Sequence, residues 1–255
     1  MAIKQTKEET INVATISKGS VDIAILGTSP LVCNSMSNKV KGELLLPKGK
    51  ANSAEKASRL KHDPVQEFRS SMYLLDDRYQ TAVGILASSF KASISNAALD
   101  LPGSTKSQIG RLVYVDGDYV PIFGAPKLFM SVVRSADMNR TPDIRTRAII
   151  PQWACVIRIS FVEPNLKATS VVNLLSAAGI TQGVGDWRPQ KGKGSYGQFS
   201  IVGADDPEFA AIVASGSREA QLSAIAHPEV YDSETENLLA WFNEEADRRG
   251  LKVSA

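Results

Sequence analysis

A glycine-rich stretch, residues 179–202, constrains the fold of this chain most strongly. Six glycines fall among positions 179–197, so the stretch cannot continue a regular helix or strand. Before it, the pattern of residues 168–178 predicts a helix that ends at Gly179, and after it the alternation of residues 198–202 predicts a short strand. The sequence therefore predicts a long loop that joins a helix to a strand.

The side chains of this loop suit a nucleic-acid backbone. Glycine lets backbone N–H groups approach a phosphate, lysine and arginine supply positive charge, and aromatic rings supply stacking faces. The alternative is a flexible hairpin in which Trp187 belongs to the core. We expect Asp186 to fix the turn or to pair with Arg188 or Lys191, because an acid repels phosphate. The candidate ligand-binding residues are Gly183, Gly185, Trp187, Arg188, Lys191, Lys193 and Tyr196.

The net charge of +2 combines two segments of opposite sign. Residues 205–249 hold eleven Asp and Glu against three Lys and Arg, a balance of −8, which leaves +10 for the rest of the chain. A basic body with an acidic C-terminal segment is typical of a protein that binds a polyanion, although a solvated acidic helix gives the same charge split.

Composition narrows the function classes. The two cysteines, Cys33 and Cys155, form no zinc pattern and no disulfide framework. The sequence has no run of about 20 apolar residues, the length needed to cross a bilayer. The polar first ten residues do not resemble a secretory signal. There is no P-loop, no GxSxG and no metal-ligand cluster in the sequence. We expect a cytoplasmic protein without a membrane partner, a metal or a cofactor.

The remaining patterns predict an α+β fold with a largely antiparallel sheet. Asp63-Pro64 opens one helix, and a second starts near Ser88. Strands are predicted at 21–26, 111–115, 119–123, 128–134, 144–150 and 153–162, with Asp116-Gly117 as a hairpin turn. Helices are predicted at 207–214, 218–226 and 232–249. We expect the last to dock through Leu238, Leu239, Trp241 and Phe242. The predicted division is a body at 1–204 and an acidic helical appendage at 205–255.

Residues 34–62 form a long basic excursion in which no periodicity predicts a helix or strand. It is either a mobile arm that crosses nucleic acid or reaches a neighbouring subunit, or a loop kept soluble by its charge. The candidate contacts in it are Lys39, Lys41, Lys48, Lys50, Arg59 and Lys61.

Two further groups of side chains are candidates. Ser88 and Ser89 at a helix start, with Lys91 in the same turn, predict an anion site, because N–H groups and the positive end of the helix dipole face outward there. The alternative is an ordinary serine cap. Arg145 and Arg147 either line a groove or occupy the solvent face of an edge strand.

Three segments, in this order, resemble the RAMP superfamily, the ferredoxin-like RNA-binding proteins of CRISPR effector complexes. They are GTSPL at 27–31 after a strand, ILASSFKASIS at 85–95, and the glycine-rich loop. The resemblance is closest to the backbone subunits that polymerise along guide RNA, and a stand-alone or viral relative fits it too. The family's Lys-Gly-x-x-Arg continuation is replaced here by KASIS, without the arginine.

The resemblance implies a ferredoxin-like (RRM-like) core in which the three segments lie on one surface. It also implies a non-catalytic protein that binds single-stranded nucleic acid, with RNA favoured over DNA, as a homo-oligomer, a filament or a subunit of a ribonucleoprotein. One alternative is a metal-independent endoribonuclease that uses His62. The others are a structural or assembly protein of viral origin and a protein that binds a nucleotide with the glycine loop.

Overall fold

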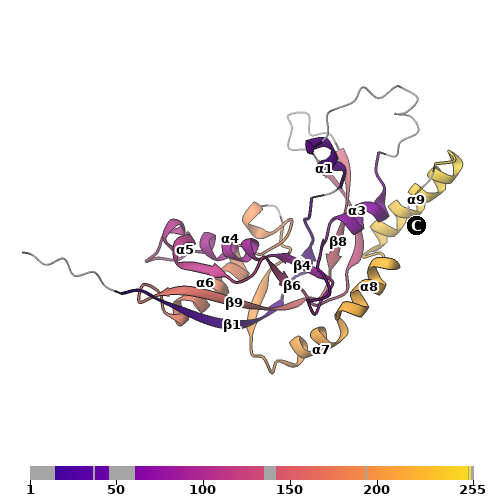
Figure 1. Cartoon of the computed structure of the whole chain (residues 1–255). Coiled ribbons are helices and arrows are strands. Elements are labelled where there is room, and N and C mark those ends of the chain that lie inside the picture. Colours follow the sequence, from indigo (N-terminus) through magenta and orange to yellow (C-terminus); the bar gives the residue numbers. More distant parts are fainter. Residues whose placement is uncertain are drawn as a thin grey trace, which may run out of the picture.

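The computed structural model describes residues 15–36, 38–45, 61–134, 142–192, 194–251 and 253. It consists of helices packed on antiparallel sheets, so the predicted α+β class is confirmed. Figure 1 shows an elongated molecule in which one sheet carries helices on its upper side. Of the C-terminal helices, α7 (Pro207–Ser215) packs below the end of β1 (Ser17–Gly27), and α8 (Arg218–Ala226) and α9 (Ser233–Arg248) lie farther from the start of that strand. Within the described residues, no helix has both the length and the hydropathy needed to cross a membrane.

One sheet of four strands forms the central part of the fold. Its spatial order is β10 (Phe199–Val202), β1 (Ser17–Gly27), β9 (Ala154–Glu163) and β5 (Val113–Val115), and all neighbours are antiparallel. In chain order, α4 (Ala87–Ala97) lies between the first two of these strands, and α6 (Ala168–Thr181) lies between the last two. This β-α-β-β-α-β order, with the fourth strand beside the first, is the ferredoxin-like arrangement. The predicted core is confirmed.

The helices cover one face of this sheet because they carry apolar stripes at helical spacing. On α4, Phe90 and Ile94 are one turn apart and fully buried, and the Phe90 ring lies 5.7 Å from that of Phe199 on β10. α6 packs beside α4, and α5 (Lys106–Leu112) connects α4 to the edge strand β5. The N-terminal halves of α4 and α5 are thereby held on a rigid layer.

Two smaller sheets extend the fold from the end of β1. One has the order β2 (Leu31–Val32), β8 (Pro142–Ile150) and β7 (Lys127–Arg134), and the other has the order β3 (Tyr73–Leu74), β4 (Val83–Leu86) and β6 (Tyr119–Pro121). α3 (Pro64–Ser70) packs against β8, and the Asp63 side chain caps it by accepting from the backbone N of Gln66, as the sequence predicted. A single hydrophobic cluster runs through all three sheets.

The predicted hairpin at Asp116-Gly117 is wrong. β5 pairs with β9, whereas β6 pairs with β4, so the two strands diverge into different sheets after the turn. The strand predicted before this turn, at 111–115, also begins too early, because residues 111 and 112 belong to α5 (Lys106–Leu112). The Thr105 hydroxyl and the Gln108 side chain form a capping box there, which decides in favour of helix.

Gly179 does not end α6 but lies inside it. A Cβ at this position would overlap the carbonyl oxygen of Phe199, so glycine is required for the close approach of helix and strand rather than for a cap. The basic excursion also differs from the prediction, because it contains the helix α1 (Asn38–Leu45). Residues 46–60, which include Lys48, Lys50 and Arg59, lie outside the described residues.

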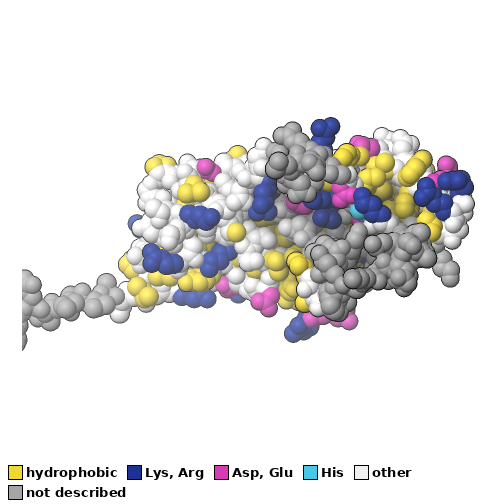
Figure 2. Space-filling view, turned by 90° about the horizontal axis from the view of Figure 1, so that it is seen from above, with side chains coloured by type: hydrophobic (Ala, Val, Ile, Leu, Met, Phe, Trp, Pro, Cys, Tyr) yellow, Lys and Arg dark blue, Asp and Glu magenta, His cyan; other side chains and the backbone are white. Residues whose placement is uncertain are grey.

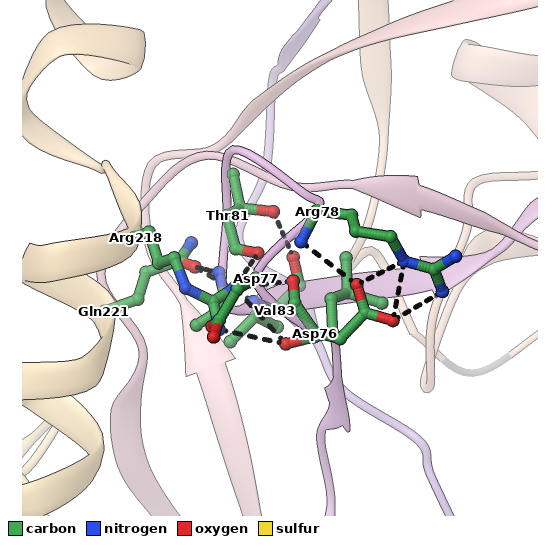
Figure 3. Close-up of polar contacts among 9 residues, drawn as sticks. Asp76, Asp77, Arg78, Thr81, Val83, Arg218 and Gln221 are labelled. Carbon is green, nitrogen blue, oxygen red and sulfur yellow. Dashed lines mark hydrogen bonds and ion pairs between the residues drawn. The ribbon is translucent and has the colours of Figure 1, made fainter.

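The predicted C-terminal helices are present as α7 (Pro207–Ser215), α8 (Arg218–Ala226) and α9 (Ser233–Arg248). Gln221 on α8 is fully buried: its amide oxygen accepts from the backbone N of Ala82 and Val83, and its amide nitrogen donates to two carbonyls. Figure 3 shows Gln221 and Arg218 reaching from one helix toward the turn before β4. These buried polar contacts fix the C-terminal segment to the sheets.

The expectation that Trp241 docks α9 is wrong, because 63% of this residue is exposed. Leu238 and Leu239 make the apolar contact, as predicted. Thr235 anchors the first turn, where its hydroxyl accepts from the backbone N of Met130 on β7, next to the bridge between Leu128 and Val230. The docking side of α9 is therefore rotated away from Trp241.

Candidate nucleic-acid interface

The fold brings the three motif segments together, although they are far apart in the sequence. The backbone N of Gly197 donates to the carbonyl of Pro30 at 2.8 Å, and the backbone N of Gln198 donates to the Ser29 hydroxyl at 2.9 Å. The Ser93 hydroxyl on α4 donates to the carbonyl of Gly183 at 3.0 Å. The first and second segments therefore both contact the glycine-rich loop.

The glycine-rich loop is held by its own backbone. The backbone N of Val184 donates to the carbonyl of Gly197, and that of Asp186 donates to the carbonyl of Val32, each at 2.9 Å. Gly183, Gly185 and Gly197 have φ between +65° and +80°, and a Cβ at Gly197 would overlap the Val184 carbonyl. These glycines are needed for the loop to fold, whatever it binds.

Both aromatic residues of the loop pack on other aromatic rings. The Trp187 ring lies edge-on to Phe129 of β7 at 5.6 Å, and Tyr196 lies 6.0 Å from Trp187 and 6.3 Å from Phe129. Tyr231, which follows α8, completes the cluster at 5.4 Å from Phe129. Trp187 therefore packs at the edge of the core, as in the hairpin alternative, and the loop is closely packed rather than flexible.

The charged residues of the loop are partly engaged. Arg188 donates to the carbonyl of Gly185 at 2.7 Å and to the Gln190 side chain at 2.9 Å. We had expected Asp186 to pair with Arg188 or Lys191. Instead, its carboxylate faces Arg147 of β8 at 3.9 Å. Its carboxylate also accepts from the backbone N of Trp187, which fixes the turn as predicted. Lys191 is exposed in the short 3-10 turn Pro189–Lys191, and Lys193 lies outside the described residues.

The start of α4 differs from an ordinary capped helix. Its N-cap is Leu86, which offers no side-chain acceptor, while Ser88 and Ser89 lie in the first turn and do not cap it. The first turn of a helix has N–H groups without intrahelical acceptors, and it is the positive end of the helix dipole. The backbone N of Ala87 donates a hydrogen bond to the carbonyl of Asp118. Ser88 is exposed in this turn, and Lys91 follows one turn later.

An open hollow of about 530 Å³ lies between α4 and α5. Two lysines, Lys91 and Lys106, face it together with Ser88 and Ser107. The Lys91 ammonium group sits 4.4 Å above the ring of Tyr114, a residue that is 44% exposed. Figure 2 looks down on this side of the molecule, where separate Lys and Arg side chains are spread over the surface. We call this feature the α4–α5 hollow.

The other basic candidates are dispersed. Lys41 is exposed on α1, whereas Lys61 pairs with Asp143 at 3.0 Å. Lys39 is also on α1, but its side chain lies outside the described residues. Arg145 is exposed on the same face of β8 as Arg147, beside the aromatic cluster of the loop. Among the predicted basic residues whose side chains the structure describes, Lys91 lines an open hollow together with Ser88 of the first turn of α4.

The free face of the four-stranded sheet does not resemble an RNA-binding sheet. RRM-type domains stack bases on exposed aromatic side chains of the sheet. Here β1, β9 and β10 expose no aromatic ring, and the exposed Tyr114 lies at the edge, on β5. Asp22 and Arg158 form a bidentate pair across β1 and β9 with two contacts of 2.7 Å. The helical side is the better candidate surface.

His62 is bracketed by two carboxylates. Its Nδ1 lies 2.8 Å from Glu67 and its Nε2 lies 3.2 Å from Asp143. The hydrogen bond to Glu67, and to a smaller extent Asp143, raises the pKa of His62 despite its partial burial. In this arrangement neither ring nitrogen is free to take a proton from a ribose hydroxyl.

Comparison with solved structures gives distant matches. The chain is similar to a solved structure described as "Crystal structure of Cmr6 from Pyrococcus furiosus", with 9% identity and a TM-score of 0.37, over 73% of this chain and 98% of that one. No protein-family model and no curated protein matches the sequence. At this TM-score the likeness is weak and supports no statement about activity.

Sequence reasoning missed three residues of the α4–α5 hollow and its rim. Lys106 and Ser107 were unassigned, and Tyr114 was placed in a hairpin. The signal for α5 was present in the spacing of Thr105 and Gln108, which is that of a capping box. Reading that box would have placed Lys106 in the first turn of a helix near Lys91.

Proposed function

We propose that this protein binds single-stranded nucleic acid, RNA in preference to DNA, through contacts to phosphates and without catalysing a reaction. The observation that carries the proposal is the α4–α5 hollow, where Lys91 and Lys106 flank the first turn of α4. Ammonium groups and helix N-termini both stabilise phosphate oxygens.

The geometry favours an extended strand over a free nucleotide. The hollow is open, and the glycine-rich loop uses its amides internally instead of presenting them around one phosphate. Tyr114, held under Lys91, offers a ring edge beside the hollow. Contacts that depend on phosphate give broad sequence tolerance and a strong dependence on salt.

We further propose that the protein acts as a homo-oligomer or as a subunit of a ribonucleoprotein. The support is the charge split: residues 205–249 carry a balance of −8, while the rest of the chain carries +10. Complementary surfaces on separate copies, or on a partner, attract one another at low salt. The same split permits the acidic segment to shield a basic surface when no nucleic acid is bound.

The proposal can be tested by fluorescence anisotropy across a series of salt concentrations. The probes are a fluorescent 15-nucleotide RNA, DNA of the same sequence, and the RNA duplex. We expect both single strands to bind, RNA more tightly, with affinity that falls steeply as salt rises. Failure to bind either single strand at low salt would overturn it.

The endoribonuclease alternative predicts cleavage of the same RNA in the presence of EDTA, lost in His62→Ala. The proposal predicts intact RNA after prolonged incubation with the wild-type protein. Cleavage by the wild-type protein that persists in His62→Ala would indicate a contaminating nuclease rather than this site.

A further inference from the structure

A second hollow, of about 420 Å³, lies on the other side of the junction between β6 and α4. Its size falls within the range of about 300–1,000 Å³ that is usual for ligand sites. It is lined by two tyrosines, Tyr73 and Tyr119, and by polar side chains from α1 and α3. We call it the tyrosine hollow.

The two tyrosine rings form one aromatic surface. Their centroids are 5.8 Å apart with an interplanar angle of 47°. Tyr73 is opposite Gly84 in the register of β3 and β4, and Tyr119 is opposite Leu86 in that of β4 and β6. Gly84 and Leu86 are two residues apart on β4, so the two tyrosines lie on the same face of this sheet. Both residues are half-buried, which leaves part of the aromatic surface open to the hollow.

The other lining groups match the remaining parts of a nucleotide. The Gln66 amide, exposed on α3, offers a donor and an acceptor of the kind that pair with a base edge. Lys41 on α1 supplies a positive charge for a phosphate. Arg69 lines the hollow too, but it donates to the carbonyls of Ile225 and Ala226 at 3.2 Å and holds the end of α8 in place.

The tyrosine hollow is close to the α4–α5 hollow along the chain. Tyr119 pairs with Leu86, the N-cap of α4, and the preceding residue, Asp118, accepts from the first backbone N of α4. Ser88, two residues beyond Leu86, already lines the α4–α5 hollow. The two hollows are therefore connected through the backbone at the start of α4.

We propose that the tyrosine hollow is a nucleobase-stacking subsite for the single strand whose phosphates contact Lys91 and Lys106. It takes an unpaired base on the Tyr73–Tyr119 surface, with Gln66 at the base edge. This inference rests on the proposed function, because it requires a single strand at the α4–α5 hollow. It adds base contacts to an interface that otherwise recognises only the backbone.

The test compares a fluorescent 15-nucleotide uridine RNA with an abasic oligomer of the same length, which keeps the sugars and phosphates. The wild-type protein should bind the uridine RNA about tenfold more tightly, since stacking on an aromatic side chain contributes an effect of this order per base. Tyr73→Leu with Tyr119→Leu should remove the preference and leave the affinity for the abasic oligomer unchanged. Tyr73→Phe with Tyr119→Phe should retain it.

The outcomes separate this inference from the proposed function. Equal affinity of the wild-type protein for both oligomers, or a preference that survives the double Leu substitution, overturns the stacking subsite while the phosphate interface stands. No binding to either oligomer overturns both. If the Leu variant does not fold, photo-crosslinking of the wild-type protein to RNA with 4-thiouridine decides: we expect crosslinks in the peptides of Tyr73 or Tyr119, and crosslinks confined to other peptides contradict the subsite.

Discussion

The hydroxyl of Ser93 donates a 3.0 Å hydrogen bond to the carbonyl oxygen of Gly183, ninety residues further along the chain. This buried contact joins α4, which carries Lys91 and the exposed Ser88, to the glycine-rich loop. The two parts of the candidate interface are therefore one structural unit.

We predict that Ser93→Ala lowers the free energy of unfolding by about 1–3 kcal/mol, because it leaves the buried Gly183 carbonyl without this donor. Ser95→Ala is the matched control on the same helix. Its hydroxyl bonds to the Lys91 carbonyl within α4, where the helix supplies its own hydrogen bonding, so the cost should be smaller. Urea denaturation of the two variants measures the difference, and equal losses would contradict the role of this contact.

Gly197→Ala and Gly192→Ala should differ although their backbone angles match. Both glycines have positive φ, +68° and +70°, so each substitution incurs a similar conformational cost of about 1 kcal/mol. A Cβ at Gly197 overlaps the Val184 carbonyl, whereas nothing lies within 4 Å of one at Gly192. We expect Gly197→Ala to be less stable than Gly192→Ala by about 2 kcal/mol or more in urea denaturation. Similar stability would show that the loop is not closely packed.

Gln221→Ala should destabilise the protein by about 2–4 kcal/mol, because it removes four hydrogen bonds and leaves buried backbone groups of β4 and the turn after β6 unpaired. Leu222→Ala on the same helix is the control, since this side chain is 48% exposed and should change stability by about 0.5 kcal/mol at most. Thermal denaturation of both variants compares them. A tolerated Gln221→Ala would mean that the C-terminal segment is not fixed to the sheets by this network.

Stability should depend on pH through His62. Its folded-state pKa is raised, first by Glu67, so the protonated ring stabilises the fold below the unfolded pKa of about 6.5. This contribution is lost as pH rises through the folded-state pKa. We expect the free energy of unfolding, measured from about pH 5.5 to pH 8.5, to fall by less in His62→Gln than in the wild-type protein. Identical pH profiles would show that the contacts with Glu67 and Asp143 do not persist in solution.

Local sequence patterns were enough to predict most helices and strands. The errors arose where pairing between distant strands overrides the local pattern. The apolar spacing of Phe90 and Ile94 was enough to predict α4, and Asp63-Pro64 was enough to predict the start of α3. The turn at Asp116-Gly117 has hairpin residues, but β9 and β4 compete for the flanking strands and separate them. No local rule reveals that competition.

Only part of the candidate site was predicted from the sequence, because long-range packing brings the other residues to it. The charge on Lys91 is visible in the sequence, yet its neighbours Lys106 and Tyr114 are brought to it by α5 and β5, and α5 was not predicted as a helix. The glycines of the loop predicted a phosphate cradle, because glycine permits both close ligand contact and close packing. The structure accounts for Gly197 by packing alone.

The salt dependence of RNA binding by Lys91→Ala/Lys106→Ala tests the central claim most directly. Each lost phosphate contact to a single strand reduces the slope of log affinity against log salt by about 0.7, so the double variant should lose about 1.4. Lys18→Ala, an exposed lysine at the far end of β1, is the control and should keep the wild-type slope. A double variant with the wild-type slope and affinity would contradict phosphate binding at the α4–α5 hollow.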